Sequence, residues 1–251
     1  MNKTSWVISA ITLTAIHGVS FASNDKIKYQ NAIQKLSNQT ITVDSVNDTP
    51  VQGIKEVVVA GGTAKEVIYL SEDGEYLFDG NLLNIKKRTN LTESTQKSLR
   101  HELMSEFRKT HEGIDFLPEQ MTDLVTVFTD IDCGVCRKFH QNVGAFNEAG
   151  IGISYLFFPR AGMGSASHQK AVNVWCANDQ QQAINQANNG VELEPLMCPN
   201  PIETQYKLGL SAGVNGTPYM VLDDGTLIPG YMTADQLKLR IEQNKSITKH
   251  D

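Results

Sequence analysis

Two cysteines separated by two residues, Cys133 and Cys136, are the part of the chain best suited to chemistry. They follow a short apolar run, 124–129, that predicts a strand, and they precede a segment with helical spacing of its apolar residues. At a helix start, unpaired N–H groups and the helix dipole favour negative charge and lower the pKa of a thiol. The motif therefore predicts thiol–disulfide exchange, with Cys133 as an exposed nucleophile and Cys136, more buried, resolving the mixed disulfide.

Two other kinds of cysteine site were weighed against this one. Zinc needs four ligands, yet Cys176 and Cys198 are not a second close pair, and no histidine has metal-ligand spacing to the motif. A cysteine hydrolase needs a histidine near Cys133, but His140 lies two helical turns away, roughly 10 Å along the axis. We therefore expect redox chemistry without a metal or other cofactor, with His140 on the surface or in the packing.

The first 22 residues predict export of the chain. Lys3 is followed by the apolar run 6–16 and by small residues ending at Ala22, which is typical of a cleaved secretory signal peptide. The run is too short to span a membrane, so no transmembrane anchor is expected. Its removal takes away one lysine and no acid, so the net charge changes from −6 to −7. An acidic chain without a basic stripe is a poor nucleic-acid binder.

Four cysteines in an exported chain indicate an oxidising compartment. They allow three pairings. If Cys133 pairs with Cys136, then Cys176 and Cys198 are left to each other, 21 residues lying between them. The economical assignment is one redox pair and one structural bridge.

A small N-terminal domain, residues 23–89, is predicted to be α+β. Its expected elements are a helix at 26–36, strands at 40–46, 55–60, 66–71 and 75–79, and a hairpin at Glu72-Asp73-Gly74. A domain of this size buries little core, which favours oligomerisation. Residues 90–112 then predict an amphipathic linker helix with Thr92 as its N-cap.

Residues 113–251 predict a larger α/β domain. Its expected strands are 124–129, 151–158, 219–222 and 226–228, and its expected helical segments follow the cysteine motif or lie at 165–189, 202–212 and after Thr233. A hairpin is expected at Asp223-Asp224-Gly225, and a capping box joins Thr233 to Gln236. The order is that of a thioredoxin fold with a helical insertion. Thr217-Pro218, directly before a strand, is a bond that can be cis.

Taken together, these features resemble the DsbC family of periplasmic disulfide isomerases. The resemblance rests on Phe128–Cys136, Gly216–Pro218, Gly225–Tyr231, Phe158–Arg160 and the pair Trp175 and Cys176. It covers essentially all the chain after the signal peptide. Two positions depart from familiar patterns: Val135 stands where this family has tyrosine, and Val127 stands where typical thioredoxins carry a buried acid.

The resemblance implies a V-shaped homodimer, joined through the N-terminal domains, whose two catalytic arms face a shared apolar cleft. Pro218 would be a cis-proline opposite Cys133, and Thr217 would offer its backbone to an extended substrate segment. Cys176 and Cys198 would form the structural disulfide. The family works in the periplasm and is kept reduced by the membrane reductase DsbD.

The predicted function is a protein disulfide isomerase and reductase acting on misfolded secreted proteins through a mixed disulfide at Cys133. One alternative is a DsbG-like reductase of sulfenic acids on single cysteines. The other is a holdase chaperone whose dimer cleft binds unfolded segments without exchange, in which case the cysteine pair would be dispensable.

Overall fold

The structure, a computed structural model, describes residues 18–36, 40–62 and 64–248. Most of the predicted signal peptide therefore lies outside the described residues. The chain divides into two compact units, residues 1–60 with 68–79 and residues 80–251 with 61–67. Within the described ranges, no helix is both long enough and apolar enough to cross a membrane.

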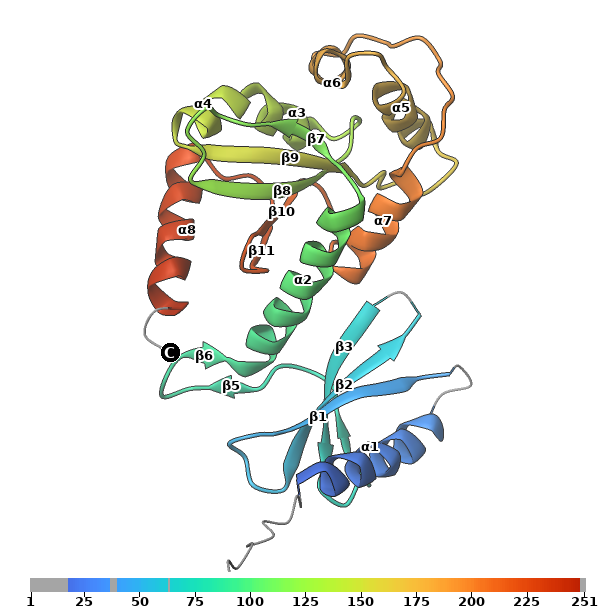
Figure 1. Ribbon diagram of the computed structural model, residues 1–251, viewed down its shortest axis with the longest axis vertical. Helices are drawn as coiled ribbons and strands as arrows, with labels where there is room; N and C mark the ends of the chain where they lie inside the picture. Colours follow the sequence, from blue (N-terminus) through green and yellow to red (C-terminus); the bar gives the residue numbers. More distant parts are fainter. Residues whose placement is uncertain (1–17, 37–39, 63, 249–251) are drawn as a thin grey trace, which may run out of the picture. The chain divides into compact units, whose positions relative to one another are not determined.

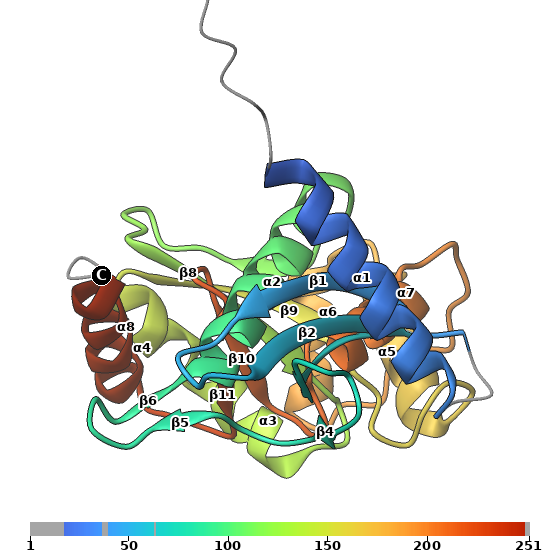
Figure 2. The same cartoon turned by 90° about the horizontal axis from the view of Figure 1, so that it is seen from below.

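The first unit packs one helix on a small antiparallel sheet (Figure 1). Its elements are α1 (Gly18–Gln34), β1 (Thr42–Asp48), β2 (Ile54–Gly61), β3 (Ala64–Ser71) and β4 (Leu77–Phe78). Tyr29 and Ile33, one helical turn apart on α1, are buried against strand residues such as Val57 and Leu70. Figure 2 shows α1 running alongside β1 and β2. The predicted hairpin between β3 and β4 is confirmed by their antiparallel pairing.

The second unit is built on a five-stranded sheet in the order β11-β10-β8-β9-β7. Its strands are β7 (Ile114–Phe116), β8 (Asp123–Thr129), β9 (Ile151–Phe157), β10 (Tyr219–Leu222) and β11 (Leu227–Pro229). The central pair, β8 and β9, is parallel and almost wholly buried, which explains why both read as continuous apolar runs. The three-residue strand β7 was not predicted from the sequence.

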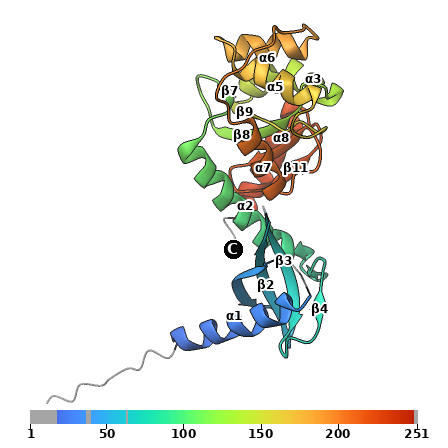
Figure 3. The same ribbon diagram turned by 90° about the vertical axis from the view of Figure 1, so that its right-hand side faces the viewer.

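Helices cover this sheet on both faces. They are α2 (Leu91–Thr110), α3 (Gly134–Gln141), α4 (Val143–Glu148), α5 (Ala166–Trp175), α6 (Gln180–Asn188), α7 (Ile202–Ser211) and α8 (Ala234–Thr248). Figures 1 and 3 show α5 and α6 together at one end of the unit, where the helical insertion was expected. The single helix predicted after the cysteine motif is two helices, since Asn142 leaves helical geometry between α3 and α4.

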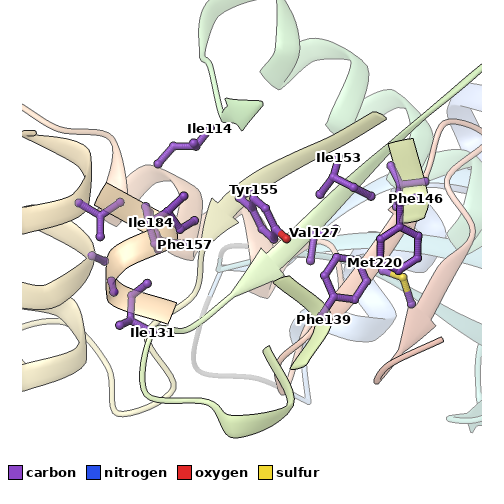
Figure 4. Packing of buried hydrophobic residues seen from close by; sticks show 14 of the residues in the cluster. Ile114, Val127, Ile131, Phe139, Phe146, Ile153, Tyr155, Phe157, Ile184 and Met220 are labelled. Atoms are coloured by element: carbon purple, nitrogen blue, oxygen red, sulfur yellow. The ribbon is translucent and has the colours of Figure 1, made fainter. Parts of the chain in front are cut away.

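Alternating side chains of β8 and β9 pack into two separate hydrophobic cores. Val127 and Tyr155 belong to the cluster under α3 and α4, in which Phe139 stacks on Phe146 (Figure 4). Phe128 belongs to the cluster on the other face, with Met104 of α2. The helix predicted as a linker, α2, thus packs within the second unit.

Two of the predicted turn and cap motifs in the second unit are confirmed. The Asp223–Gly225 turn joins β10 to β11, and a Cβ at Gly225 would overlap the carbonyl oxygen of Lys97 on α2. The capping box is present: Thr233 N–H donates to Gln236 Oε1 at 3.0 Å, and Gln236 N–H donates to Thr233 Oγ1 at 3.4 Å.

The predicted N-cap of α2 is wrong. Asn90 caps the helix, its Oδ1 accepting from Glu93 N–H at 3.1 Å. Thr92 lies inside the first turn, where it is buried and its Oγ1 accepts from Leu82 N–H at 2.8 Å. Asn90 also ends a short ladder, β5 (Leu83–Asn84) with β6 (Thr89–Asn90), that the sequence did not reveal.

Candidate active site

The Cys-x-x-Cys motif lies where β8 passes into α3. Cys133 is the N-cap residue of α3, with extended backbone angles (φ −88°, ψ 114°), and its Sγ accepts a hydrogen bond from Cys136 N–H at 3.3 Å. Its own N–H donates to the Asp130 carbonyl oxygen at 3.0 Å. The sulfur therefore lies at the N-terminus of a helix, where the backbone favours a thiolate over a thiol.

The two thiols of the motif have very different proton affinities. Burial raises the pKa of Cys133, but hydrogen bonding with Cys136, together with the positive charge on Arg160, outweighs burial and brings the pKa below the ordinary thiol value. Burial, followed by the hydrogen bond with Cys133, raises the pKa of Cys136 to about 12. Cys133 is thus the readily ionised sulfur, and Cys136 keeps its proton at neutral pH.

The expectation of an exposed nucleophile is wrong. Cys133 is 3% exposed, and Cys136, which was expected to be more buried, is 1% exposed. The cause is the chain at Thr217, whose carbonyl oxygen lies 3.3 Å from Cys133 Sγ and accepts the S–H hydrogen bond. The neighbouring Val135 side chain is 48% exposed. A substrate disulfide must therefore pass close to these neighbours to reach the sulfur.

The chain opposite the motif is the segment that enters β10. The Thr217–Pro218 peptide bond is cis. The structure thus brings Cys133, Cys136, Thr217 and Pro218 together, although Thr217 follows Cys133 by 84 positions in the sequence.

Cys176 and Cys198 form a disulfide bond in the second unit. Their sulfurs are 1.95 Å apart and their Cα atoms 5.7 Å apart. Cys176 is the C-cap of α5, and Cys198 lies in the irregular stretch between α6 and α7.

A buried carboxylate and an arginine, not identified from the sequence as a pair, flank the motif. Asp130 Oδ1 accepts from Asp132 N–H at 2.8 Å, and Oδ2 accepts from Arg160 N–H at 2.9 Å and from Arg160 Nε–H at 3.1 Å. These bonds hold a guanidinium whose positive charge lowers the pKa of Cys133. The only sequence signal for Arg160 was its place in the Phe158–Arg160 run.

The charged side chains next to the motif in the sequence, those of Asp132, Arg137 and Lys138, contact other groups. Arg137 Nε–H donates to the carbonyl oxygen of Ile131 at 3.1 Å, and Lys138 Nζ lies 4.9 Å from the ring centroid of Tyr231. Asp132 pairs with Lys170 on α5. Their positions in sequence therefore say little about the field at Cys133.

His140 is buried in the packing and not on the surface. Its Nδ1 is 3.1 Å from the Tyr155 hydroxyl, and its Nε2 is 2.6 Å from Asn185 Oδ1. Burial lowers the pKa of His140, so the ring is neutral at neutral pH. Among the residues that the structure describes, no three or more His, Cys, Asp or Glu side chains form a group that could hold a metal ion.

Comparison with known proteins covers both units. A family described as "Thioredoxin-like domain" matches residues 113–245, and one described as "Disulfide bond isomerase protein N-terminal domain" matches residues 20–93. The thiol:disulfide interchange protein DsbC of Dickeya dadantii is 33% identical over 257 residues, covering 99% of each chain. DsbC of Escherichia coli K12 is 32% identical over 228 residues, covering 91% of this chain and 92% of the relative.

One solved structure that resembles part of the chain is that of a disulfide interchange protein from Neisseria gonorrhoeae. It has a TM-score of 0.47 and 26% identity, and the likeness covers 53% of this chain and 95% of that chain. At this TM-score it adds no argument to the sequence relatives.

Proposed function

Because this chain belongs to the DsbC family of thiol:disulfide interchange proteins, and so is a thiol:disulfide oxidoreductase, we propose that it rearranges incorrect disulfides in misfolded secreted proteins. The observation that carries the proposal is the contrast within the motif. The pKa of Cys133, at the N-cap of α3, is lowered, whereas burial raises that of Cys136 to about 12. A reactive thiolate beside a slow second thiol suits an isomerase.

In the first step the Cys133 thiolate attacks one sulfur of a substrate disulfide. An S–S bond forms between Cys133 and that sulfur, and the other substrate sulfur leaves as a thiolate. This freed thiolate can attack a different disulfide of the same substrate, and a later attack on the mixed disulfide releases Cys133 as a thiolate. The net result is a new pairing with no change in the number of disulfides.

The second exit from the mixed disulfide is reduction. Cys136 loses its proton and attacks Cys133, which gives a Cys133–Cys136 disulfide and a reduced substrate. Burial, the main cause of the raised pKa of Cys136, is still present in the mixed disulfide, so this exit is slower than the attack by Cys133. An enzyme oxidised in this way needs an external reductant, for which we propose the membrane reductase DsbD.

Substrate binding is assigned to Thr217 and Pro218. The Thr217 carbonyl oxygen that closes over Cys133 Sγ is a main-chain acceptor placed at the reacting atom. An extended substrate segment that pairs with this backbone would bring its disulfide to Cys133. The disulfide between Cys176 and Cys198 has a structural role in this proposal.

The remaining assignments concern the whole chain. We propose a cleaved signal peptide at 1–22, a dimerisation domain at 23–89, a linker helix at 90–112 and a catalytic domain at 113–251, in a homodimer of the periplasm. The match of residues 20–93 to the disulfide bond isomerase N-terminal family supports the small domain. Its buried core is modest, so a second copy would bury further apolar surface.

The decisive experiment measures two activities of the reduced protein side by side. One is recovery of a scrambled protein with several disulfides, and the other is reduction of a single-disulfide substrate. We expect strong recovery, loss of both activities in Cys133→Ser, and retention of some recovery in Cys136→Ser. Reduction without recovery would favour the sulfenic-acid reductase, and undiminished activity of Cys133→Ser would favour a holdase.

The dimer assignment has its own test. A fragment that starts near Gly80, and therefore keeps the packing of α2 in the second unit, should reduce simple disulfides. It should lose most recovery of scrambled protein, because a rearranging substrate is no longer held near Cys133. Sedimentation of the mature chain as a monomer, or full recovery activity of the fragment, would remove the dimer from the mechanism.

A further inference from the structure

The proton on Cys136 is the obstacle to the resolving step of the proposed function. With a pKa of about 12, Cys136 is a thiol at neutral pH, and its sulfur attacks Cys133 only as the proton leaves. The residue is 1% exposed, so bulk water does not reach it freely. A buried group must therefore accept this proton if resolution is to compete with dissociation.

The sheet beneath the motif carries one polar side chain, Tyr155, that is as deeply buried as Cys136. Val127 of β8 has no proton acceptor in its side chain, but its register partner on the parallel strand β9 is Tyr155. Side chains of register partners lie side by side on one face of a sheet, and Figure 4 shows Tyr155 and Val127 so placed, with Phe139 of α3 nearby. Burial, followed by the charge of an ionised Cys136, raises the pKa of Tyr155.

The Tyr155 hydroxyl is hydrogen-bonded to a base, the His140 ring. Asn185 Oδ1 accepts a hydrogen bond, so His140 Nε2, 2.6 Å away, carries the ring proton. His140 Nδ1 is then unprotonated and accepts from the Tyr155 hydroxyl at 3.1 Å. His140 also follows Cys136 by four residues on α3, which places both on the same face of the helix, one turn apart.

We propose that Tyr155 and His140 form a relay that accepts the Cys136 proton while Cys136 attacks the mixed disulfide. The Cys136 proton passes to the Tyr155 oxygen, and the Tyr155 proton passes to His140 Nδ1. The Cys136 sulfur forms the bond to Cys133, and the substrate sulfur leaves as a thiolate with the electron pair of the broken bond. The imidazolium, still bonded to Asn185, later releases the proton to solvent. Both side chains act through Cys136 and are positioning residues in the proposed reaction.

The surroundings keep His140 neutral until the medium is acidic. The groups that face it are Tyr155 from β9, Asn185 from α6, the edge of the Phe116 ring from β7 and Cys136 on its own helix. All four are uncharged in the reduced resting state at neutral pH. Burial is therefore the main influence on the pKa of His140, and it brings that pKa below the ordinary histidine value.

The test uses the full mature protein and the small disulfide 5,5′-dithiobis(2-nitrobenzoate). Attack by Cys133 releases one coloured thiolate, and attack by Cys136 on the resulting mixed disulfide releases a second, so stopped-flow absorbance separates the two steps. In Tyr155→Phe, which removes only the hydroxyl, we expect the second phase at pH 7 to slow by at least about tenfold. The first phase should stay within about twofold of the wild-type rate.

The matched control is Tyr206→Phe, which removes a tyrosine hydroxyl from the opposite face of the sheet, where Tyr206 stacks on Phe158. It should leave both phases unchanged. His140→Gln is the second variant: it keeps a hydrogen-bonding side chain but removes the base, so it decides the matter if Tyr155→Phe fails to fold. Thermal unfolding of each variant shows whether it is folded, and the rates of folded variants alone are compared.

The pH profile separates a relay from mere packing. In the wild type the second-phase rate should level off above the pKa of His140, whereas in both variants it should rise about tenfold per pH unit, because hydroxide must remove the proton. The relay is excluded if the wild type rises in this way without a plateau, or if a folded Tyr155→Phe or His140→Gln matches it at every pH. Absence of the first phase in the wild type would instead refute the proposed function.

Discussion

Replacing Cys176 and Cys198 together with alanine removes the bridge that ties an irregular stretch of chain to α5. Besides the disulfide, two α5 side chains bind this stretch: Gln169 Nε2 donates to the Leu196 carbonyl oxygen at 3.1 Å, and Leu196 N–H donates to Asn173 Oδ1 at 3.0 Å. Neither bond fixes the chain as firmly as a covalent link. We expect the variant to fold but to be markedly less stable.

The magnitude follows from the length of the closed loop. The two cysteines are 22 residues apart in sequence. A cross-link over that length lowers the entropy of the unfolded chain by an amount worth about 3.4 kcal/mol at 25 °C. A domain is stable by about 5–15 kcal/mol, so the bridge supplies a substantial part of the stability of the second unit.

The fluorescence of Trp175 provides the assay. The chain has two tryptophans, and the other, Trp6, lies in the predicted signal peptide, so Trp175 reports on the second unit alone in the mature protein. With a urea slope of about 2 kcal/mol per molar, the loss of 3.4 kcal/mol lowers the unfolding midpoint by about 1.7 M.

The control for this experiment is Met197→Ala, beside Cys198 in the same stretch. Met197 is 93% exposed, so its truncation should change the free energy of unfolding by less than about 0.5 kcal/mol. If the alanine pair loses less than about 1 kcal/mol at an unchanged urea slope, the loop-entropy reasoning is refuted.

Three further outcomes are expected. Arg160→Gln should raise the pKa of Cys133, because a positive charge that favours the thiolate is gone, and Arg160→Lys should restore most of the shift; ultraviolet thiolate absorbance against pH measures both. Alkylation of the reduced protein should modify Cys133 at a rate that rises with pH and levels off above its lowered pKa, while Cys136 stays unmodified up to pH 9; peptide mapping that finds Cys136 modified first would contradict this. Asn90→Ala should cost about 1 kcal/mol of stability through loss of the α2 cap, and an unchanged urea midpoint would argue against the cap.

The sequence by itself determined the order of the main elements and the place of the reactive thiol. Apolar runs predicted β8 and β9, Asp-Gly turns predicted both hairpins, and the capping box at Thr233 predicted the start of α8. The motif between a strand and a helix predicted the position of Cys133 at a helix N-terminus. These signals are local, because periodicity, turn chemistry and caps depend on residues within a few positions of one another.

Only the tertiary structure decided what surrounds the two sulfurs. The Thr217 carbonyl oxygen closes over Cys133 from 84 residues away, the buried Asp130 binds Arg160 from 30 residues away, and His140 meets Asn185 from 45 residues away. No local pattern encodes such pairs. They follow from which strands lie side by side and which helix faces meet, and a side chain's exposure, charge and proton affinity depend on that packing.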